Sequence, residues 1–456
     1  MIVDRALQAC VVNALEPEWE ARFEPRSYGF RPGRGCQDAI AAIYVTLKGP
    51  NPRRRWALDA DLAGAFDRID HSHLLGLLGT FPARAMIAQW LAAGVIDQGR
   101  FAPTEQGVPQ GGVVSPVLLN IALHGMEHAA GVRYRHVGVD GVDTMPGSLV
   151  LVRYADDLIA LCHSRDQAYE VKAALAEWLT PKGLAFNDDK TRIVSVDDGF
   201  DFLGFNVRRY PNGKLLITPS ADAVRRLRAR LRVEMCAARG ANVGAVLRAI
   251  NPIVRGWSAY YRTVVSSATF HRLDDHLWKL AYKWATHSHP NKPKRWIMSR
   301  YFGRFNPARN DHWVFGDRDS GAYLRKFSWT RIVRHQLVKG TSSPDDPTLA
   351  GYWAERRRRG PPPPMDGADL RLLKAQDGRC SLCGGFLLHA DHEPQHPREW
   401  ERWIAVTRKA MSKHHIVERA TPATSHAATL VHAHCHRRHT VGDPALLPAR
   451  EPTRLA

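Results

Sequence analysis

The sequence is poor in cysteine, with only seven in 456 residues. Four of these cysteines stand far apart along the chain: Cys10, Cys36, Cys162 and Cys236. The remaining three share one His-rich segment: Cys380, Cys383 and Cys435. This spacing argues against a disulfide framework and indicates metal binding in a reducing compartment.

Long hydrophobic runs are also lacking. No apolar stretch approaches the roughly 18 residues that a membrane span needs, and residues 1–15 do not place a basic end before an apolar signal core. We therefore predict a soluble, cytoplasmic protein without a membrane partner. The mixture of 24% charged and 44% hydrophobic residues excludes a disordered chain, and the length predicts about three domains.

Acidic residues are scarce in only one part of the chain. Residues 201–360 hold 31 basic and 11 acidic residues, whereas residues 1–200 hold 20 and 24, and residues 361–456 hold 13 and 10. A basic excess confined to one region attracts a polyanion. We therefore predict that residues 201–360 bind RNA or DNA, with an ordinary basic surface as the alternative. Aromatic residues interleaved with the charges are candidates for stacking on bases.

Two stretches of the acidic third are predicted to be strands. Residues 55–62 alternate in polarity, and residues 148–162 form two apolar runs joined at Asp156 and Asp157, which indicates a hairpin with carboxylates at its turn. From residue 221 the pattern becomes helical, because apolar residues recur every three or four positions. These apolar positions are Val224, Leu227, Leu231 and Met235.

Three carboxylates in these strands suit phosphoryl transfer. The two-metal route needs about three acidic groups that hold two Mg²⁺ ions roughly 4 Å apart. Asp61 ends the first strand, so it meets Asp156 and Asp157 if the strands are neighbours in one sheet. The apolar runs around the Asp-Asp pair make its charges costly unless a cation neutralises them. The alternative for such a pair alone is a solvated loop.

The order of motifs around these carboxylates identifies a family. Tyr154-Ala155-Asp156-Asp157 resembles the Tyr-x-Asp-Asp box of reverse transcriptases. The blocks on either side of the box resemble those of group II intron reverse transcriptase/maturases: residues 27–34, 61–71, 106–116, 183–191 and 202–205. Residues 250–278 resemble the maturase or X region that follows the polymerase in this family. The resemblance covers essentially residues 1–440.

The resemblance implies an α+β multidomain fold. It places a reverse transcriptase palm of the right-hand polymerase type, with partial fingers, in residues 1–210. A helical thumb and RNA-binding maturase X region would occupy residues 211–355. A basic, Pro-rich linker is expected over residues 356–370, where four arginines precede Gly360 and four prolines. A small, zinc-stapled, HNH-like (ββα-metal) domain would occupy residues 371–445.

The resemblance also implies roles for the carboxylates and their neighbours. Asp61 and Asp156 would bind both Mg²⁺ ions, with Asp157 as the third carboxylate. Phe66 would crowd the incoming sugar and disfavour a 2′-OH.

Three further residues match nucleotide-binding positions of the family. Leu62 and Gln110 would contact the incoming nucleotide. Lys190 would lie near the triphosphate, where a cation can stabilise the leaving pyrophosphate.

The family carries a further segment before the block that corresponds to residues 2–9, including basic finger strands that grip template and triphosphate. The sequence begins at Met1 without it. We expect either a start assigned too far downstream or a remnant whose polymerase cannot clamp its substrates.

A Cys/His set near the end of the chain predicts zinc. Cys380 and Cys383, with His432 and Cys435, form two pairs at the spacing of a tetrahedral Zn²⁺ site. This structural zinc would stabilise a domain that has little core of its own. Other histidines are alternatives for the fourth ligand: His434, and more weakly His389, His392 and His396.

The zinc segment resembles the HNH endonuclease appended to many group II intron proteins. His414 and His415 resemble its first element, in which one His holds a metal and the next activates water, and His436 resembles a closing metal ligand. The middle Asn of the motif is missing, since its place falls at Ala427. We predict a zinc-stapled DNA-binding module, with nuclease activity as the alternative.

The predicted function is that of an RNA-directed DNA polymerase and maturase of a group II intron, in a bacterial-type cytoplasm. Its partners would be the intron RNA, target DNA and deoxynucleoside triphosphates; the sequence specifies neither the cognate intron nor an oligomeric state. One alternative is a polymerase-inactive splicing cofactor that binds RNA through its basic region. A plain HNH endonuclease is the third hypothesis.

Overall fold

The computed structural model describes residues 2–49, 52–97, 100–109, 111–137, 141–359, 367–388, 394–415 and 428–441. The chain forms two compact units. Unit 1 comprises Met1–Ala223 and His335–Arg356, and unit 2 comprises Val224–Arg334 and Arg357–Ala456. Among the described residues, none of the helices combines the length and apolar character that crossing a membrane requires.

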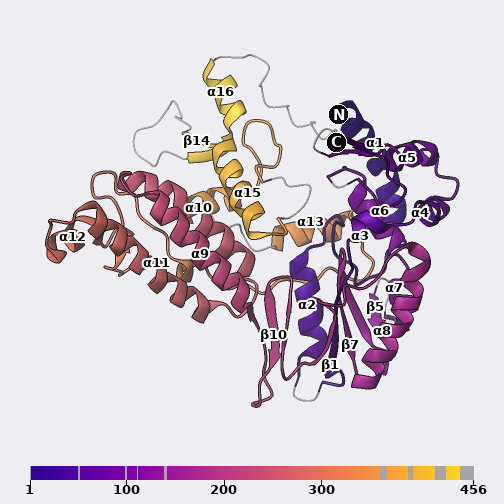
Figure 1. Cartoon of the computed structure of the whole chain (residues 1–456). Helices are drawn as coiled ribbons and strands as arrows, with labels where there is room; N and C mark the ends of the chain where they lie inside the picture. The colour runs from indigo at the N-terminus through magenta and orange to yellow at the C-terminus, as the bar shows by residue number, and fades with distance from the viewer. Residues whose placement is uncertain are drawn as a thin grey trace, which may run out of the picture. The chain divides into compact units, whose positions relative to one another are not determined.

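A four-stranded antiparallel sheet forms the centre of unit 1. Its strand order is β6 (Val150–Tyr154), β7 (Asp157–Cys162), β1 (Trp56–Asp61) and β8 (Arg192–Ser195). The helix α2 (Cys36–Leu47) packs on β6, and α8 (Arg165–Leu179) packs on β1, β7 and β8. Figure 1 shows these two helices on either side of β7. Because helices cover the hairpin, β6 and β7 are nearly continuous apolar runs rather than alternating ones, and the predicted hairpin is confirmed.

Further helices and two-stranded ribbons complete the first part of unit 1. They are α1 (Ile2–Glu20), α3 (Ala65–Arg68), α4 (His71–Leu78), α5 (Arg84–Leu91), α6 (Ser115–Ala122), α7 (Met126–Ala129), the 3-10 turn η1 (Thr180–Lys182), and the two-stranded ribbons of β2 (Val95–Asp97) with β3 (Arg100–Ala102) and β4 (Tyr134–Val137) with β5 (Gly141–Thr144). One hydrophobic core joins α1, α4, α6 and α8 to the sheet. The helices therefore fix the edge of the sheet at which β1 and the hairpin end.

A second, three-stranded sheet crosses the domain boundary that the sequence predicted at residue 210. Its order is β11 (Leu215–Pro219), β10 (Phe205–Arg209) and β9 (Phe200–Phe202), and β10 pairs with β11 along its whole length. The Arg209 guanidinium donates to the Gly49 and Leu47 carbonyls beside α2. Unit 1 therefore continues to residue 223.

Residues 335–356 also belong to unit 1, although we expected them in the RNA-binding region. The buried Asp38 carboxylate of α2 accepts from the Val338 backbone N–H at 2.9 Å and contacts His335 Nε2 at 2.9 Å. Arg34 donates to the Gly340 carbonyl at 2.8 Å. A buried carboxylate needs such partners, so the returning segment completes the unit. It contains η3 (Pro347–Leu349) and the start of α13 (Ala350–Arg359).

Unit 2 begins with the helices of the basic region. These are α9 (Ala221–Ala237), α10 (Val243–Tyr261), α11 (Ser267–Ser288) and α12 (Lys294–Tyr301), followed by β12 (Phe302–Gly303), β13 (Val314–Phe315) and η2 (Phe327–Trp329). The helical period predicted from residue 221 is confirmed. Trp257 lies 5.9 Å from both Phe270 and Phe327 between ring centroids, in a buried cluster. Several aromatics of this region therefore form core rather than a stacking surface.

The end of the described chain adds α14 (Gly367–Ala375), α15 (Pro397–Ala410), the paired strands β14 (Met411–His415) and β15 (Ala428–His432), and α16 (Ala433–Val441). Within unit 2, α15 packs on α10. Arg230 donates to both carboxylate oxygens of Glu401 at 2.6 and 2.8 Å. A Cβ on Gly256 would lie 2.6 Å from the Pro397 carbonyl oxygen, so this glycine permits the close packing.

Candidate active site and metal centre

The strand register brings the three predicted carboxylates together. The pairing of β1 with β7 sets Asp61 directly opposite Asp157, and Asp156 precedes β7 in the turn. Asp61 lies close enough to Asp157 to raise the pKa of the Asp157 carboxyl. The two aspartates of the turn and the aspartate at the end of β1 therefore form one cluster of half-buried acids.

Burial and mutual repulsion make this cluster electrostatically unfavourable without cations. Burial, and then the neighbouring Asp156 charge, raise the pKa of Asp157 to about 7. Burial also raises the pKa of Asp156, and Asp61 adds to this effect. Adjacent carboxylates that resist ionisation together are typical of sites that bind divalent cations.

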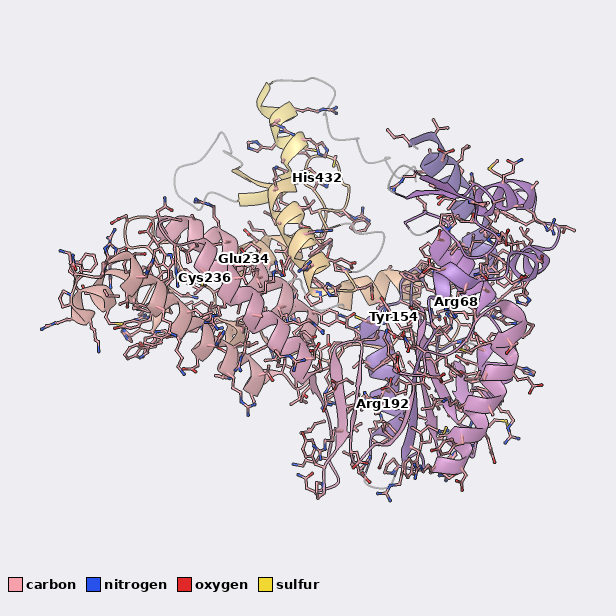
Figure 2. All side chains as sticks on the ribbon, viewed as in Figure 1. Arg68, Tyr154, Arg192, Glu234, Cys236 and His432 are labelled. Carbon is pink, nitrogen blue, oxygen red and sulfur yellow. The ribbon has the colours of Figure 1, made fainter. Side chains whose placement is uncertain are left out.

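Two basic side chains neutralise the acids on β1. Lys190 Nζ donates to Asp61 Oδ2 at 2.6 Å, and Arg192 Nε donates to Asp59 Oδ2 at 2.9 Å. The structure therefore places Lys190 beside Asp61, and its role near the triphosphate stays a prediction. Figure 2 labels Arg192 on β8 and Tyr154 at the end of β6, both in the strands of unit 1.

The other residues predicted to contact the nucleotide differ in burial and in whether the structure describes them. Phe66 lies half-buried on α3, one turn beyond Asp61. The Leu62 side chain is buried in the core at 2% exposure, which differs from the nucleotide contact that we expected. Only the backbone of Leu62 remains available for that role. Gln110 lies outside the described residues.

The turn that carries Asp156 and begins the strand of Asp157 is held in a strained conformation. Ala155 has a φ of 56°, in the left-handed region that residues with a Cβ rarely adopt. Gly29 lies against this turn, since a Cβ there would meet the Ala155 nitrogen and lie 2.9 Å from the Tyr154 carbonyl carbon. Such strain persists where the surrounding structure imposes it.

A buried arginine supports the turn from beneath. Arg153 is 1% exposed and donates from Nη1 to Asn120 Oδ1 at 3.0 Å and to the Ala155 carbonyl at 3.1 Å. Asn120 Nδ2 in turn donates to the Gly29 carbonyl at 2.9 Å. Sequence reasoning missed Arg153, although an arginine inside an apolar strand was a signal that could have identified it.

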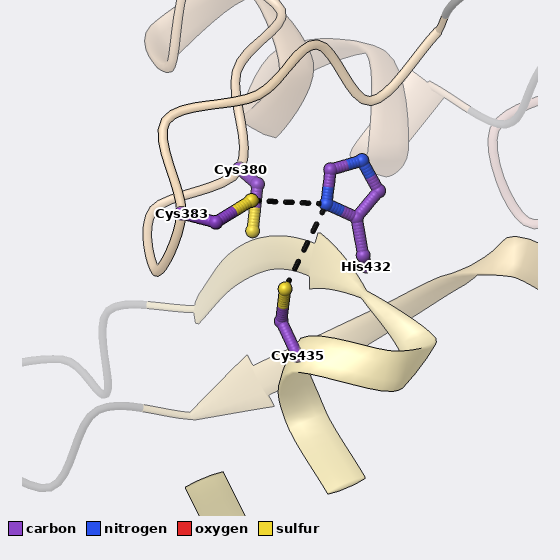
Figure 3. A group of neighbouring side chains, drawn as sticks. All are labelled: Cys380, Cys383, His432 and Cys435. Atoms are coloured by element: carbon purple, nitrogen blue, oxygen red, sulfur yellow. Dashed lines mark hydrogen bonds between the residues drawn. The ribbon is translucent and has the colours of Figure 1, made fainter. Parts of the chain in front are cut away.

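The predicted zinc ligands also converge. The ligand atoms of Cys380, Cys383, His432 and Cys435 lie within 4.8 Å of one another. Figure 3 shows the two cysteines of one loop facing the His432 ring and Cys435. The His432 Nδ1 atom is 3.3 Å from Cys383 Sγ and 3.9 Å from Cys435 Sγ. Three sulfurs and one imidazole at this separation fit tetrahedral Zn²⁺.

Hydrogen bonds around the cluster favour the forms of His432 and Cys380 that bind a metal. His432 Nε2 contacts the Phe386 carbonyl oxygen at 3.0 Å. A proton on Nε2 satisfies this carbonyl and leaves the Nδ1 lone pair facing the thiols, as in many zinc sites. Burial opposes ionisation of the Cys380 thiol. Hydrogen bonds from backbone N–H groups, the largest contribution being that of His432, nevertheless lower its pKa to about 7.

Of the predicted nuclease residues, only His436 has a described side chain, and it lies outside this cluster. His414 and His415 lie on β14, but their side chains are outside the described part of the chain. His436 lies on α16, next to Cys435, and the cluster formed by the described residues does not include it. His434 stacks on the His432 ring at 5.0 Å and also stays outside the cluster. His389 and His392 lie outside the described residues.

Curated relatives match parts of the chain. Protein YkfC of Escherichia coli is 32% identical over 232 residues, which cover 45% of this chain and 61% of the relative. Group II intron-encoded protein LtrA of Lactococcus lactis is 37% identical over 128 residues, covering 27% and 21%. An uncharacterized 91 kDa protein in the cob intron of Schizosaccharomyces pombe is 28% identical over 261 residues, covering 46% and 32%. The chain thus spans only part of the length of each.

Solved structures and two family models also match parts of the chain. Apo telomerase from Candida tropicalis has a TM-score of 0.35 at 13% identity, covering 65% of this chain and 52% of that one. The family model described as reverse transcriptase (RNA-dependent DNA polymerase) matches residues 1–207, and the group II intron maturase-specific domain matches residues 224–302. The chain therefore carries a reverse transcriptase domain followed by the maturase-specific domain of group II intron proteins.

Proposed function

We propose that this chain is an RNA-directed DNA polymerase and maturase that acts on a group II intron RNA. The observation that carries the proposal is the convergence of Asp61, Asp156 and Asp157 at the end of β1 and the hairpin. This cluster lies within the residues that the reverse transcriptase model matches. Its substrates would be deoxynucleoside triphosphates, an RNA template and a primer on target DNA.

The three carboxylates would hold two Mg²⁺ ions, and the raised pKa values of Asp156 and Asp157 suit such ligands. When bound, the two ions stabilise charge on the attacking and leaving oxygens. Lys190, beside Asp61, supplies a cation for the triphosphate. Phe66 narrows the space at the sugar, and the rigid Ala155 turn fixes the carboxylates so that little reorganisation is needed during the reaction.

The sheet of unit 1 and the helices of the basic region would correspond to parts of a right-hand polymerase. The four-stranded sheet with α8 would be the palm of a right-hand polymerase, and α9 to α11 the thumb and RNA-binding maturase X region. The excess of 31 basic over 11 acidic residues in 201–360 supports binding of the intron RNA there. Such substrates favour a cytoplasmic location.

The last described part would be an HNH-like zinc module. The order of β14, β15 and α16 suits a ββα-metal arrangement, and Cys380, Cys383, His432 and Cys435 suit structural Zn²⁺. We propose DNA binding rather than cleavage for this module, because the middle Asn of the nuclease motif is missing from the sequence.

Primer extension on an RNA template tests the polymerase. The purified chain is supplied with Mg²⁺ and deoxynucleotides, beside Asp156→Asn and the matched control Asp198→Asn, whose carboxylate is exposed in a turn. We expect wild type and the control to extend the primer, and Asp156→Asn to lose about 10³-fold or more of the rate. No extension by wild type, together with salt-sensitive binding of intron RNA, would favour the polymerase-inactive splicing cofactor instead.

A further inference from the structure

Phe30 is an aromatic residue that the structure holds in an unfavourable position. Its φ is 59°, which is an outlier for a bulky side chain. Its side chain is 44% exposed, so the ring also forgoes much of the burial that a phenylalanine normally gains. A residue that is both strained and exposed is most readily explained when its ring serves a site.

The backbone on both sides of Phe30 is fixed. Before it, Gly29 is held against Ala155, and the Gly29 carbonyl accepts from Asn120 at 2.9 Å. After it, the buried Arg31 donates from Nε and Nη2 to the two carboxylate oxygens of Glu20, at 2.8 Å each. The backbone that carries the Phe30 ring is therefore fixed by contacts that the ring itself does not make.

The ring points to the residue proposed to select the sugar. The centroids of Phe30 and Phe66 lie 6.1 Å apart with an angle of 71° between the ring planes, which is the edge-to-face arrangement that aromatic pairs favour. Phe66 stands on α3, a helix of only four residues that begins after the left-handed Gly64. Because α3 is so short, contact with the Phe30 ring restricts the movement of the Phe66 ring.

We propose that Phe30 is a specificity-determining residue of the nucleotide site, because it holds the Phe66 ring in place as a wall against the 2′-OH of a ribonucleotide. This inference rests on the proposed polymerase function. The loop of residues 28–31 then links two parts of one site, since Gly29 contacts the turn of the catalytic aspartates and Phe30 contacts the sugar wall. Phe30 acts through Phe66 as a positioning residue.

The test compares dATP with ATP. Incorporation kinetics (kcat/KM for each nucleotide) are measured on an RNA template, together with equilibrium binding of each nucleotide to the complex with a chain-terminated primer. The variants are Phe30→Gly, Phe30→Tyr and Phe66→Ala. Tyr169→Ala serves as the control, because Tyr169 is an aromatic of similar exposure on α8, at 50%.

Phe30→Gly is informative because glycine tolerates the positive φ. We expect its melting temperature to stay unchanged or rise, while its preference for dATP over ATP falls about 10-fold. Phe30→Tyr keeps the ring and should keep the preference, as should Tyr169→Ala. A merely structural Phe30 would instead lower stability and leave the ratio unchanged.

The outcomes separate this inference from the function on which it rests. If Phe66→Ala loses the preference and Phe30→Gly retains it, Phe66 forms the wall without Phe30 and the inference is overturned. If wild type binds dATP selectively without incorporating it, the binding ratios of the variants decide the question in the same way. A wild-type chain that neither binds nor incorporates dATP would overturn the polymerase proposal and the wall with it.

Discussion

Arg153 donates a 3.0 Å hydrogen bond to Asn120 directly beneath the turn that carries Asp156 and Asp157. The same Arg153 nitrogen donates to the Ala155 carbonyl, while Asn120 donates to Gly29 on the other side of the turn. Arg153, Asn120 and Gly29, from three separate segments, thus surround the strained Ala155. The positions of Asp156 and Asp157, the proposed catalytic aspartates, therefore depend on this arrangement.

Replacing Arg153 by methionine should disturb the turn specifically. The change leaves the Asn120 oxygen and the Ala155 carbonyl without their buried donor, which costs about 3 kcal/mol of folding free energy. We expect a lower melting temperature and a higher Mg²⁺ concentration at half-maximal extension. Arg209→Met is the matched control, since Arg209 is also buried and donates to backbone carbonyls, but beside α2. If Arg209→Met raised the Mg²⁺ concentration at half-maximal extension as much as Arg153→Met, a specific role of Arg153 in supporting the turn would be contradicted.

Adding one methyl group at Gly29 should be far more damaging than at another glycine. A Cβ at Gly29 would collide with the backbone of Tyr154 and Ala155. We expect Gly29→Ala to reduce primer extension about 100-fold or more, because a small displacement of positioned catalytic groups is costly. Gly76→Ala, inside α4 with open space around it, should instead stabilise the chain by about 0.5–1 kcal/mol. Thermal melts and extension rates of both variants check this contrast.

Stability should depend on pH through Glu127. Burial, and then the Glu24 charge, raise the pKa of this carboxyl to about 7, while its oxygens accept from the Arg26 backbone N–H and from the Tyr134 hydroxyl. Because the folded state holds this proton more tightly than the unfolded state does, stability falls as pH rises from about 4.5 to about 7. We expect Glu127→Gln to weaken this fall and to melt above wild type at pH 8. Glu105→Gln, an exposed site, should follow wild type; equal pH profiles for all three proteins would refute the prediction.

Zinc binding by the chain should require Cys435 but not His434. Cys435→Ser removes one of the four clustered ligands, so we expect the bound zinc to fall from about one per chain to near zero, as measured by atomic emission. Protease digestion should then cut within residues 367–441. His434→Ala should retain zinc, because its ring only stacks on His432. Loss of zinc in both variants would show that the fourth ligand is misassigned.

The sequence alone determined the local features of this protein. The apolar runs of residues 148–162 specified a hairpin, and the helical period after residue 221 specified α9, because burial on one or both faces dictates where apolar residues fall. The order of motifs around Asp61, Asp156 and Asp157 was enough to indicate the family. The spacing of Cys380, Cys383, His432 and Cys435 was enough to indicate a metal site.

Only the tertiary structure decided which distant residues meet. The return of residues 335–356 to Asp38 crosses about 300 positions, and no local period encodes such a contact. The support of the Ala155 turn by Arg153, Asn120 and Gly29 joins three segments through buried hydrogen bonds, which exist only once packing has excluded water. The exposure and strain of Phe30 follow from the same cause, since its conformation is imposed by neighbours that are far away in the sequence.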